Sequence, residues 1–325
     1  MKKQKATLKE RFYQWFHKTP GEWVRFGILS VAIIALCVSI VWLVLIFTEY
    51  RKGDQEYDEL QNYITEVQDE GEEPTQDEGS EEAQEQKKYT ADPTTEYHRV
   101  DVDFDGLKAI NPDVVAWIQF ETVKISYPVV QGTDDEYYLK HTFKGQENSA
   151  GSIFMAASSK SDFSYMNTII FGHNMKNASM FGWLGRYKSE SFYAGHEYFW
   201  IYTPEADYRY QICSVHETLA EGDALFWSDK PCQEYTDYVQ KIMSASKYNT
   251  GVSMAEDDKM VTLATCTSKG KQYRLFVHGK LIETISHVQE ETQEEETVTY
   301  TGKMVDNGIQ IESVEQTETT ETTEN

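Results

Sequence analysis

With 325 residues the chain is long enough for two average domains, but its net charge of −24 is concentrated in two stretches with almost no large apolar residues, 68–85 and 287–325. Such stretches bury too little apolar surface to offset the entropy of ordering, so we expect both to be largely disordered and one compact domain to fill 98–286. The acidic balance argues against nucleic acid as a partner, because phosphate binding requires clustered Lys and Arg.

The first element in the chain is an uncharged apolar run, FGILSVAIIALCVSIVWLVLIF, at residues 26–47. Its length predicts a helix that crosses a membrane. Seven Lys and Arg precede it in 1–25, and positive charge stays on the cytoplasmic side, so we expect 1–25 to be a cytoplasmic basic segment. A cleaved signal peptide is the competing interpretation, but no small-x-small cleavage site follows the run. We therefore expect a single-pass protein of the cell membrane with everything after Arg51 outside the cell.

Residues 48–97 are interpreted as an extracytoplasmic stalk and an acidic linker. Apolar residues recur there at spacings of three and four: Tyr57, Leu60, Tyr63, Ile64 and Val67. This spacing predicts a short amphipathic helix, which either packs on the next domain or serves as a stalk.

The domain at 98–286 is mostly short β-like runs broken by Gly, Asn and Asp. The runs lie at 114–120, 125–130, 151–156, 167–173, 198–203, 208–215, 260–266 and 273–282. Eight strands at this spacing predict a mostly β fold, a closed or nearly closed barrel. Apolar residues at helical intervals predict one helix at 234–248, before the last two strands. There is neither a Gly-rich phosphate loop nor a Cys/His cluster with metal-ligand spacing, so we expect no cofactor and no metal.

Three of the four cysteines, Cys213, Cys232 and Cys266, follow the apolar run, and an odd number leaves at least one thiol unpaired within the chain. Cys213 lies in an apolar strand pattern, which favours a buried small hydrophobe over a functional thiol. Cys232 follows Pro231 in a loop. Cys266 ends the strand VTLATC and precedes the polar run TSKGKQ, so it is the thiol with the accessibility that a nucleophile needs.

Arg274 is placed symmetrically with Cys266 about Gly270, the expected apex of the intervening loop. In a hairpin centred on Gly270 the two residues face each other, with Cβ atoms about 4.5–5.5 Å apart. A guanidinium at this distance stabilises a thiolate or the oxyanion formed when a carbonyl is attacked. The alternative is a solvated charge on an edge strand, and spacing alone does not separate the two.

The remaining partner is an acid or base, and the eight histidines offer several candidates. His278 is in phase with Arg274, but its flanks favour a packing role. His141 lies in the run YYLKHTF, where a structural role is the default. His173 ends the strand NTIIFG and opens the small, polar loop NMKNAS, and a strand-end histidine after Gly can project into a cleft. Position alone leaves it one candidate among several.

Two motifs resemble those of the sortase family. TLATC at 262–266, followed by YRLFVHGKL at 273–281, is similar to the sortase cysteine and arginine signature, and FGHNMKNASMFGWL at 171–184 is similar to the histidine motif, particularly of class B. Two further stretches, YPVVQGTDDEYYLKHTF at 127–143 and GSIFM at 151–155, also resemble class B members. The resemblance covers nearly all of the outer domain.

The resemblance implies a cysteine transpeptidase. Cys266 attacks the threonine carbonyl of a C-terminal sorting signal on a secreted protein and forms a thioester. His173 then protonates the leaving amine and later activates the incoming one, while Arg274 orients the substrate or steadies the oxyanion. An amine of a cell-wall precursor or of a pilin subunit resolves the thioester. Thr265 is carried over as a residue that shapes the oxyanion site.

The chain departs from the family pattern at three places. Thr267 and Ser268 follow the cysteine, where some class B members carry an acidic residue. Asp135 stands where Asn is expected in relatives, which places it in the substrate groove with an altered chemistry. The acidic tail at 287–325 is not part of the family pattern.

Two other functions fit the residues. The first is an extracytoplasmic cysteine peptidase that uses the same thiol and histidine but releases the acyl group to water. The second is a non-catalytic surface-display protein whose β domain binds a partner.

Overall fold

The structure of the protein is a computed structural model that describes residues 20–67, 99–219, 224–267, 269–287, 297–305 and 308–317. The chain divides into two compact units, Met1–Ile285 and Ser286–Asn325. The acidic stretch 68–85 and most of the basic segment 1–25 lie outside the described residues, so the disorder expected for 68–85 stays a prediction.

The larger unit contains a closed eight-stranded barrel with the strand order β10-β8-β7-β3-β4-β5-β6-β9. Its strands are β3 (Val114–Phe120), β4 (Ser126–Val130), β5 (Ile153–Met155), β6 (Asn167–Phe171), β7 (Tyr198–Tyr202), β8 (Ala206–Leu219), β9 (Met260–Thr267) and β10 (Gly270–Ser286). All eight predicted strands and the closed barrel are confirmed. The pairs β4–β5 and β6–β9 are parallel.

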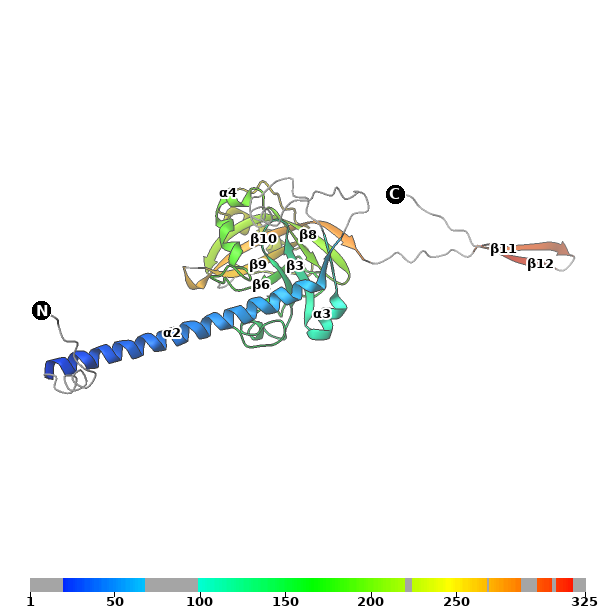
Figure 1. Cartoon of the computed structure of the whole chain (residues 1–325). Helices are drawn as coiled ribbons and strands as arrows, with labels where there is room; N and C mark the ends of the chain where they lie inside the picture. The colour runs from blue at the N-terminus through cyan, green and yellow to red at the C-terminus, as the bar shows by residue number, and fades with distance from the viewer. Residues whose placement is uncertain are drawn as a thin grey trace, which may run out of the picture. The chain divides into compact units, whose positions relative to one another are not determined.

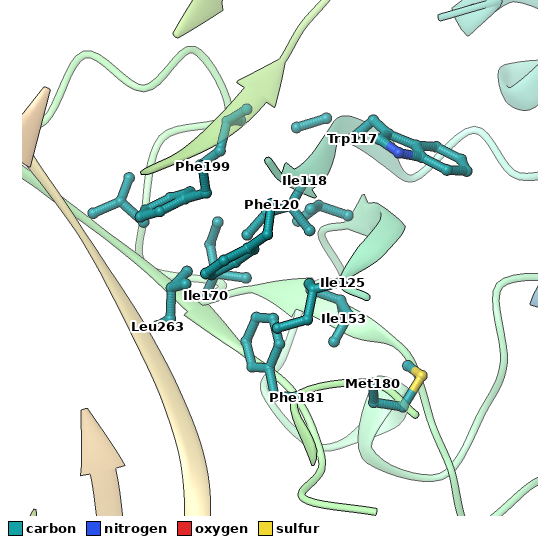
Figure 2. Packing of buried hydrophobic residues seen from close by; sticks show 14 of the residues in the cluster. Trp117, Ile118, Phe120, Ile125, Ile153, Ile170, Met180, Phe181, Phe199 and Leu263 are labelled. Atoms are coloured by element: carbon teal, nitrogen blue, oxygen red, sulfur yellow. The ribbon is translucent and has the colours of Figure 1, made fainter. Parts of the chain in front are cut away.

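The barrel closes around an aliphatic and aromatic core, because alternate residues of each strand point inward. Figure 2 shows Phe120, Ile170, Phe199 and Leu263 pointing toward one another from four different strands, and all four are buried. Phe120 and Phe199 stack with their ring centroids 4.9 Å apart. Burial of this apolar surface is the main force that holds the barrel closed.

One face of the barrel is covered by the helix α5 (Gln233–Ser244), which confirms the helix predicted before β9, with bounds shifted at both ends. Its buried side chains form a second apolar cluster with Met166 and Met260: Tyr235, Tyr238, Val239 and Ile242. The short elements α3 (Phe104–Ile110), η3 (Tyr137–Leu139), η4 (Gly182–Lys188) and α4 (Glu190–Tyr193) complete the flanks. Asp103 caps α3 by accepting a hydrogen bond from the Gly106 amide at 2.8 Å.

The apolar run and the region after it form one unbroken helix, α2 (Pro20–Leu60), which Figure 1 shows in blue. Its first part is long and apolar enough to cross a membrane, and its large apolar side chains between Ile28 and Phe47 are exposed. Its last part packs on the barrel: the buried Tyr57 donates a hydrogen bond to the Gly151 carbonyl at 2.6 Å.

The separate short helix expected after the apolar run is therefore the end of α2, and it packs rather than serving as a free stalk. The prediction fails beyond Leu60, where the chain forms η1 (Gln61–Tyr63) and β1 (Ile64–Glu66). β1 pairs with β2 (Val100–Val102), and that pairing satisfies backbone groups that a helix would have satisfied internally.

The second unit contains two paired strands, β11 (Thr297–Val305) and β12 (Gly308–Thr317). The expectation that 287–325 is largely disordered therefore does not hold for these residues. Composition concealed the strand signal, which is the alternation of β-branched or aromatic residues such as Val298, Tyr300, Ile309 and Ile311 with polar ones.

Candidate active site

Cys266 lies near the end of β9, half-buried, and directly opposite Arg274 on β10. Opposed residues of an antiparallel pair leave the same face of the sheet, so the thiol and the guanidinium share a face. The predicted pairing is confirmed, but the predicted apex at Gly270 is wrong. Gly270 pairs with Thr267, and an irregularity between Gly270 and Arg274 restores the register at Cys266.

Arg274 is not on an edge strand, because β10 is bordered by β9 and β8 in the closed barrel. The alternative of a charge that blunts an exposed edge is therefore excluded. The side chain is half-buried, and its Nη1 donates to the Tyr273 carbonyl at 3.2 Å, which orients the guanidinium.

His173 lies two residues beyond the end of β6, whose parallel partner β9 carries Cys266. In the parallel β6–β9 pair Phe171 is opposite Ala264, and two residues further along the strands are His173 and Cys266. The Asn174 side-chain amide donates to the Cys266 carbonyl at 2.9 Å, which joins the segment after β6 to the end of β9. Because β9 lies between β6 and β10, Cys266 lies on the strand between the one that leads to His173 and the one that carries Arg274.

The ring of His173 is oriented by the backbone of η3. Its Nε2 lies 2.7 Å from the Leu139 carbonyl oxygen, and because a carbonyl only accepts, Nε2 carries the proton in this arrangement. The neutral ring then has Nδ1 as its proton acceptor. Neither Leu139 nor Asn174 is among the site residues predicted from the sequence. The only sequence signal for Asn174 is its position directly after His173, and Leu139 has none.

Gly172 is required by the close packing just before the histidine. A Cβ at this position would lie 2.7 Å from a ring carbon of Phe181 and closer still to the methyl of Ile153. Figure 2 shows Phe181 beside Ile125 and Ile153, so the chain that leaves the histidine loop is embedded in the core. The absence of a side chain lets β6 end against this core with His173 outside it.

The two further site candidates both have structural partners. Thr265 is buried, and its Oγ1 donates to the Gly172 carbonyl at 2.7 Å, which joins β9 to the histidine segment. Asp135 is exposed, and its carboxylate accepts the Ala157 amide at 2.7 Å. A role of either in substrate binding stays a prediction.

Cys213, Cys232 and His278 differ from Cys266 in their position in the fold. Cys213 is buried, as its strand pattern indicated, and His278 is buried too, which fits the packing role favoured for it; Cys232 is the half-buried residue that precedes α5. Within the described part of the chain no group of three or more His, Cys, Asp or Glu side chains is arranged to hold a metal ion.

The fold is a closed eight-stranded β-barrel, and its candidate site presents a thiol, Cys266, near the end of β9. The sortase domain family model matches residues 118–282, and the chain belongs to the sortase family. It is a cysteine transpeptidase of the class B type.

Sortase B is the relative that recurs in both sequence and structure comparisons. Sortase B of Listeria monocytogenes is 33% identical over 199 residues, 60% of this chain and 80% of the relative. Sortase B of Staphylococcus aureus is 28% identical over 199 residues, 61% and 82% of the two chains. The structure of sortase B from Bacillus anthracis in complex with AAEK1 matches with a TM-score of 0.57 and 30% identity, covering 73% of this chain and all of that one.

Proposed function

We propose that Cys266 is the nucleophile, His173 the general acid and base, and Arg274 the oxyanion or substrate-orienting group. The observation that supports this most directly is the position of Cys266 on the middle strand of three, opposite Arg274 of one neighbour and with His173 just beyond the end of the other. A thiol, an imidazole and a guanidinium at one barrel end are the groups that acyl transfer through a thioester needs.

In the first half of the reaction the Cys266 thiolate attacks the threonine carbonyl of a sorting signal. The oxyanion of the tetrahedral intermediate lies against Arg274. Protonated His173 then gives its proton to the departing amine, and the thioester forms as the C–N bond breaks. In the second half the neutral ring takes a proton from the acceptor amine as it attacks, and the thiolate departs. Each proton lost by His173 is regained, so the enzyme returns to its starting state.

The site residues are tested by trapping the acyl-enzyme. The full-length protein in detergent micelles is incubated with a panel of threonine-containing sorting peptides without an amine, and the intact mass is measured. We expect an increase equal to the N-terminal peptide fragment, mapped to Cys266. The matched controls are Cys266→Ala and Cys232→Ala: the first abolishes the adduct and the second retains it. An adduct on another residue, or one that survives in Cys266→Ala, overturns the assignment.

Transfer and hydrolysis are separated by adding an amine acceptor. The transpeptidase predicts ligated product whose yield rises to saturation with the amine, whereas a cysteine peptidase gives only the free acid at every amine concentration. A non-catalytic display protein gives neither product. We propose an amine of a cell-wall precursor or a pilin subunit as the natural acceptor.

We further propose that residues 26–47 anchor the enzyme in the cell membrane with the catalytic domain outside. The long apolar part of α2 and the basic flank before it support this orientation. Protease added to intact cells should digest the catalytic domain of a tagged chain and leave a cytoplasmic N-terminal tag protected. Digestion of that tag before the cells are lysed would contradict the orientation.

A further inference from the structure

The loop that follows His173, residues 174–181, is held in an unfavourable backbone conformation. Ala178 and Met180 have φ angles of 65° and 53°, in the left-handed region that residues with a Cβ rarely adopt. Within the loop the Asn177 side-chain oxygen accepts the Ser179 amide at 3.2 Å and its hydroxyl at 2.8 Å. A loop of this kind keeps its shape only if the surrounding structure holds it.

Both ends of the loop are fixed to the proposed catalytic residues. On one side the Asn174 amide donates to the Cys266 carbonyl at 2.9 Å, and on the other the Phe181 amide donates to the His173 carbonyl at 2.9 Å. A change in the shape of the loop therefore changes the position of His173 relative to Cys266.

The holder of the loop's middle is α2. The Asn177 side-chain nitrogen lies 3.1 Å from each carboxylate oxygen of Asp54, a residue of α2. Asp54 is half-buried by this contact, and that burial raises the pKa of its carboxyl, an effect that the hydrogen bond from Asn177 partly offsets. A hydrogen bond to a carboxylate is of the stronger, charge-assisted kind when that acceptor is ionised.

A second connection runs from the same helix through a pair of tyrosines. The Met180 amide donates to the Tyr127 hydroxyl at 3.0 Å, and the Tyr127 ring packs edge-on against Tyr57 of α2, with the centroids 5.4 Å apart. Each strained residue of the loop is therefore linked to α2. Ala178 follows Asn177, which bonds to Asp54. Met180 bonds to Tyr127, which packs on Tyr57.

The position of α2 is itself fixed by contacts on either side of Asp54. The buried Glu56 carboxylate accepts the Thr142 hydroxyl at 2.9 Å and the Lys144 amide at 2.8 Å. Five residues before Asp54, the Asn148 side-chain amide donates to the Glu49 carbonyl at 3.0 Å. Asp54 is therefore presented to the loop by a helix that is docked on the barrel.

We propose that Asp54 is a positioning residue for His173 and that it acts by holding the 174–181 loop through Asn177. The helix that carries the apolar segment thereby takes part in the geometry of the active site. This inference rests on the proposed role of His173.

The test is an exchange of hydrogen-bond partners in the full-length protein. Asn177→Asp sets two carboxylates against each other and should lower kcat about tenfold or more with little change in KM; Asp54→Ala should do the same less severely. In the double variant D54N/N177D the amide now at position 54 donates and the carboxylate now at position 177 accepts, so the donor and the acceptor change places. The oxygen of residue 177 that accepts from Ser179 is kept. We expect the double variant to recover most of the parent kcat.

The matched control is Asp58→Ala, one turn further along α2 on an exposed residue, which should keep the parent kcat. If Asp54 had a purely structural role, the decrease in kcat of each variant would follow the decrease in its melting temperature. The double variant would then show no recovery of kcat beyond the recovery of its melting temperature. The proposal is overturned if Asn177→Asp and Asp54→Ala turn over like the parent, or if the double variant stays as slow as Asn177→Asp. The proposed function fails separately, if His173→Ala keeps its turnover.

Discussion

Cys266 and Arg274 are a cross-strand pair on adjacent strands inside a closed barrel, so their separation is set by sheet geometry and not by a flexible loop. This matters chemically because an oxyanion is stabilised best by a donor that is already in place when the charge develops. The Arg274 guanidinium is further fixed by its bond to the Tyr273 carbonyl.

Arg274→Lys should lower kcat/KM at least about 100-fold, because an ammonium replaces the planar fork with a shorter point charge and removes the geometry of two parallel donors. Initial rates of peptide ligation measure the effect. Arg99→Lys is the matched control, since Arg99 pairs with Asp207 at 3.6 Å outside the site and its change should alter kcat/KM less than about twofold. A lysine variant as fast as the parent would remove Arg274 from the mechanism.

Ala178→Gly should stabilise the protein. The left-handed backbone at Ala178 costs about 1–2 kcal/mol for a residue with a Cβ, and glycine adopts it freely, against about 0.4–1 kcal/mol of added entropy in the unfolded chain. We expect the free energy of unfolding to rise by about 0.5–1 kcal/mol in urea denaturation. Ala157→Gly, at a residue outside the left-handed region, should be neutral or destabilising. A loss of stability in Ala178→Gly would refute the strain.

Among the elements, the β9–β10 turn is tied to β8 by a buried carboxylate. The Glu217 side chain, only 4% exposed, pairs with Lys269 of the turn at 3.0 Å, and with Lys188 at 2.7 Å and Lys247 at 3.2 Å. Burial would raise the pKa of Glu217, but the three lysines lower it to about 2. One side chain thus joins the turn beside Cys266 to η4 and to the segment after α5.

Glu217→Gln should lower the free energy of unfolding by about 2 kcal/mol at pH 7, because three ammonium groups lose their shared anion. Urea denaturation measures the loss, and the exposed Glu205→Gln serves as the control. Since the folded-state pKa is below the ordinary value, this stabilisation is present above about pH 4.5 and is lost only as the pH falls toward 2. An unchanged unfolding midpoint in Glu217→Gln would mean that the cluster contributes nothing.

The eight strands and α5 could be predicted from sequence because each is a local pattern of apolar alternation or helical spacing. The Cys266–Arg274 pair could be predicted for the same reason, since both residues lie in one short hairpin. The irregularity between Gly270 and Arg274, which shifts the turn away from Gly270, has no local sequence signal. The place of His173 beside Cys266 could not be predicted from spacing. It depends on a parallel pairing in which Asn174 contacts a residue 92 positions later. The resemblance to a family, not the residue pattern, selected that histidine.

For the whole molecule, a buried pair of histidines makes stability depend on pH. His216 and His278 stack beside α5 with centroids 5.1 Å apart, both nearly inaccessible. Burial, with Lys241 and Lys247 nearby, lowers the pKa of His216 to about 4, and burial with His216 lowers the pKa of His278 well below its ordinary value.

The unfolded chain binds protons at these sites below about pH 6.5 while the folded chain does not, so stability should be flat above that pH and fall as the pH decreases toward 4. At pH 5 each histidine should cost about 2 kcal/mol relative to pH 7. Urea midpoints across this range measure the slope, and His216→Phe should remove about half of it. A stability that rises between pH 7 and pH 5 would contradict the buried neutral pair.

The parallel β6–β9 pairing also has a consequence for how the enzyme comes into being. Contacts between distant parts of a chain form only after the long intervening loop has been closed, which makes them slow to appear. Until β6 and β9 meet, Cys266 is separated from the proposed acid and base, His173, even though the proposed oxyanion group, Arg274, is only a hairpin away. If the proposed roles of these residues hold, a chain whose barrel has not yet closed carries no working active site, and barrel closure is the step that assembles it.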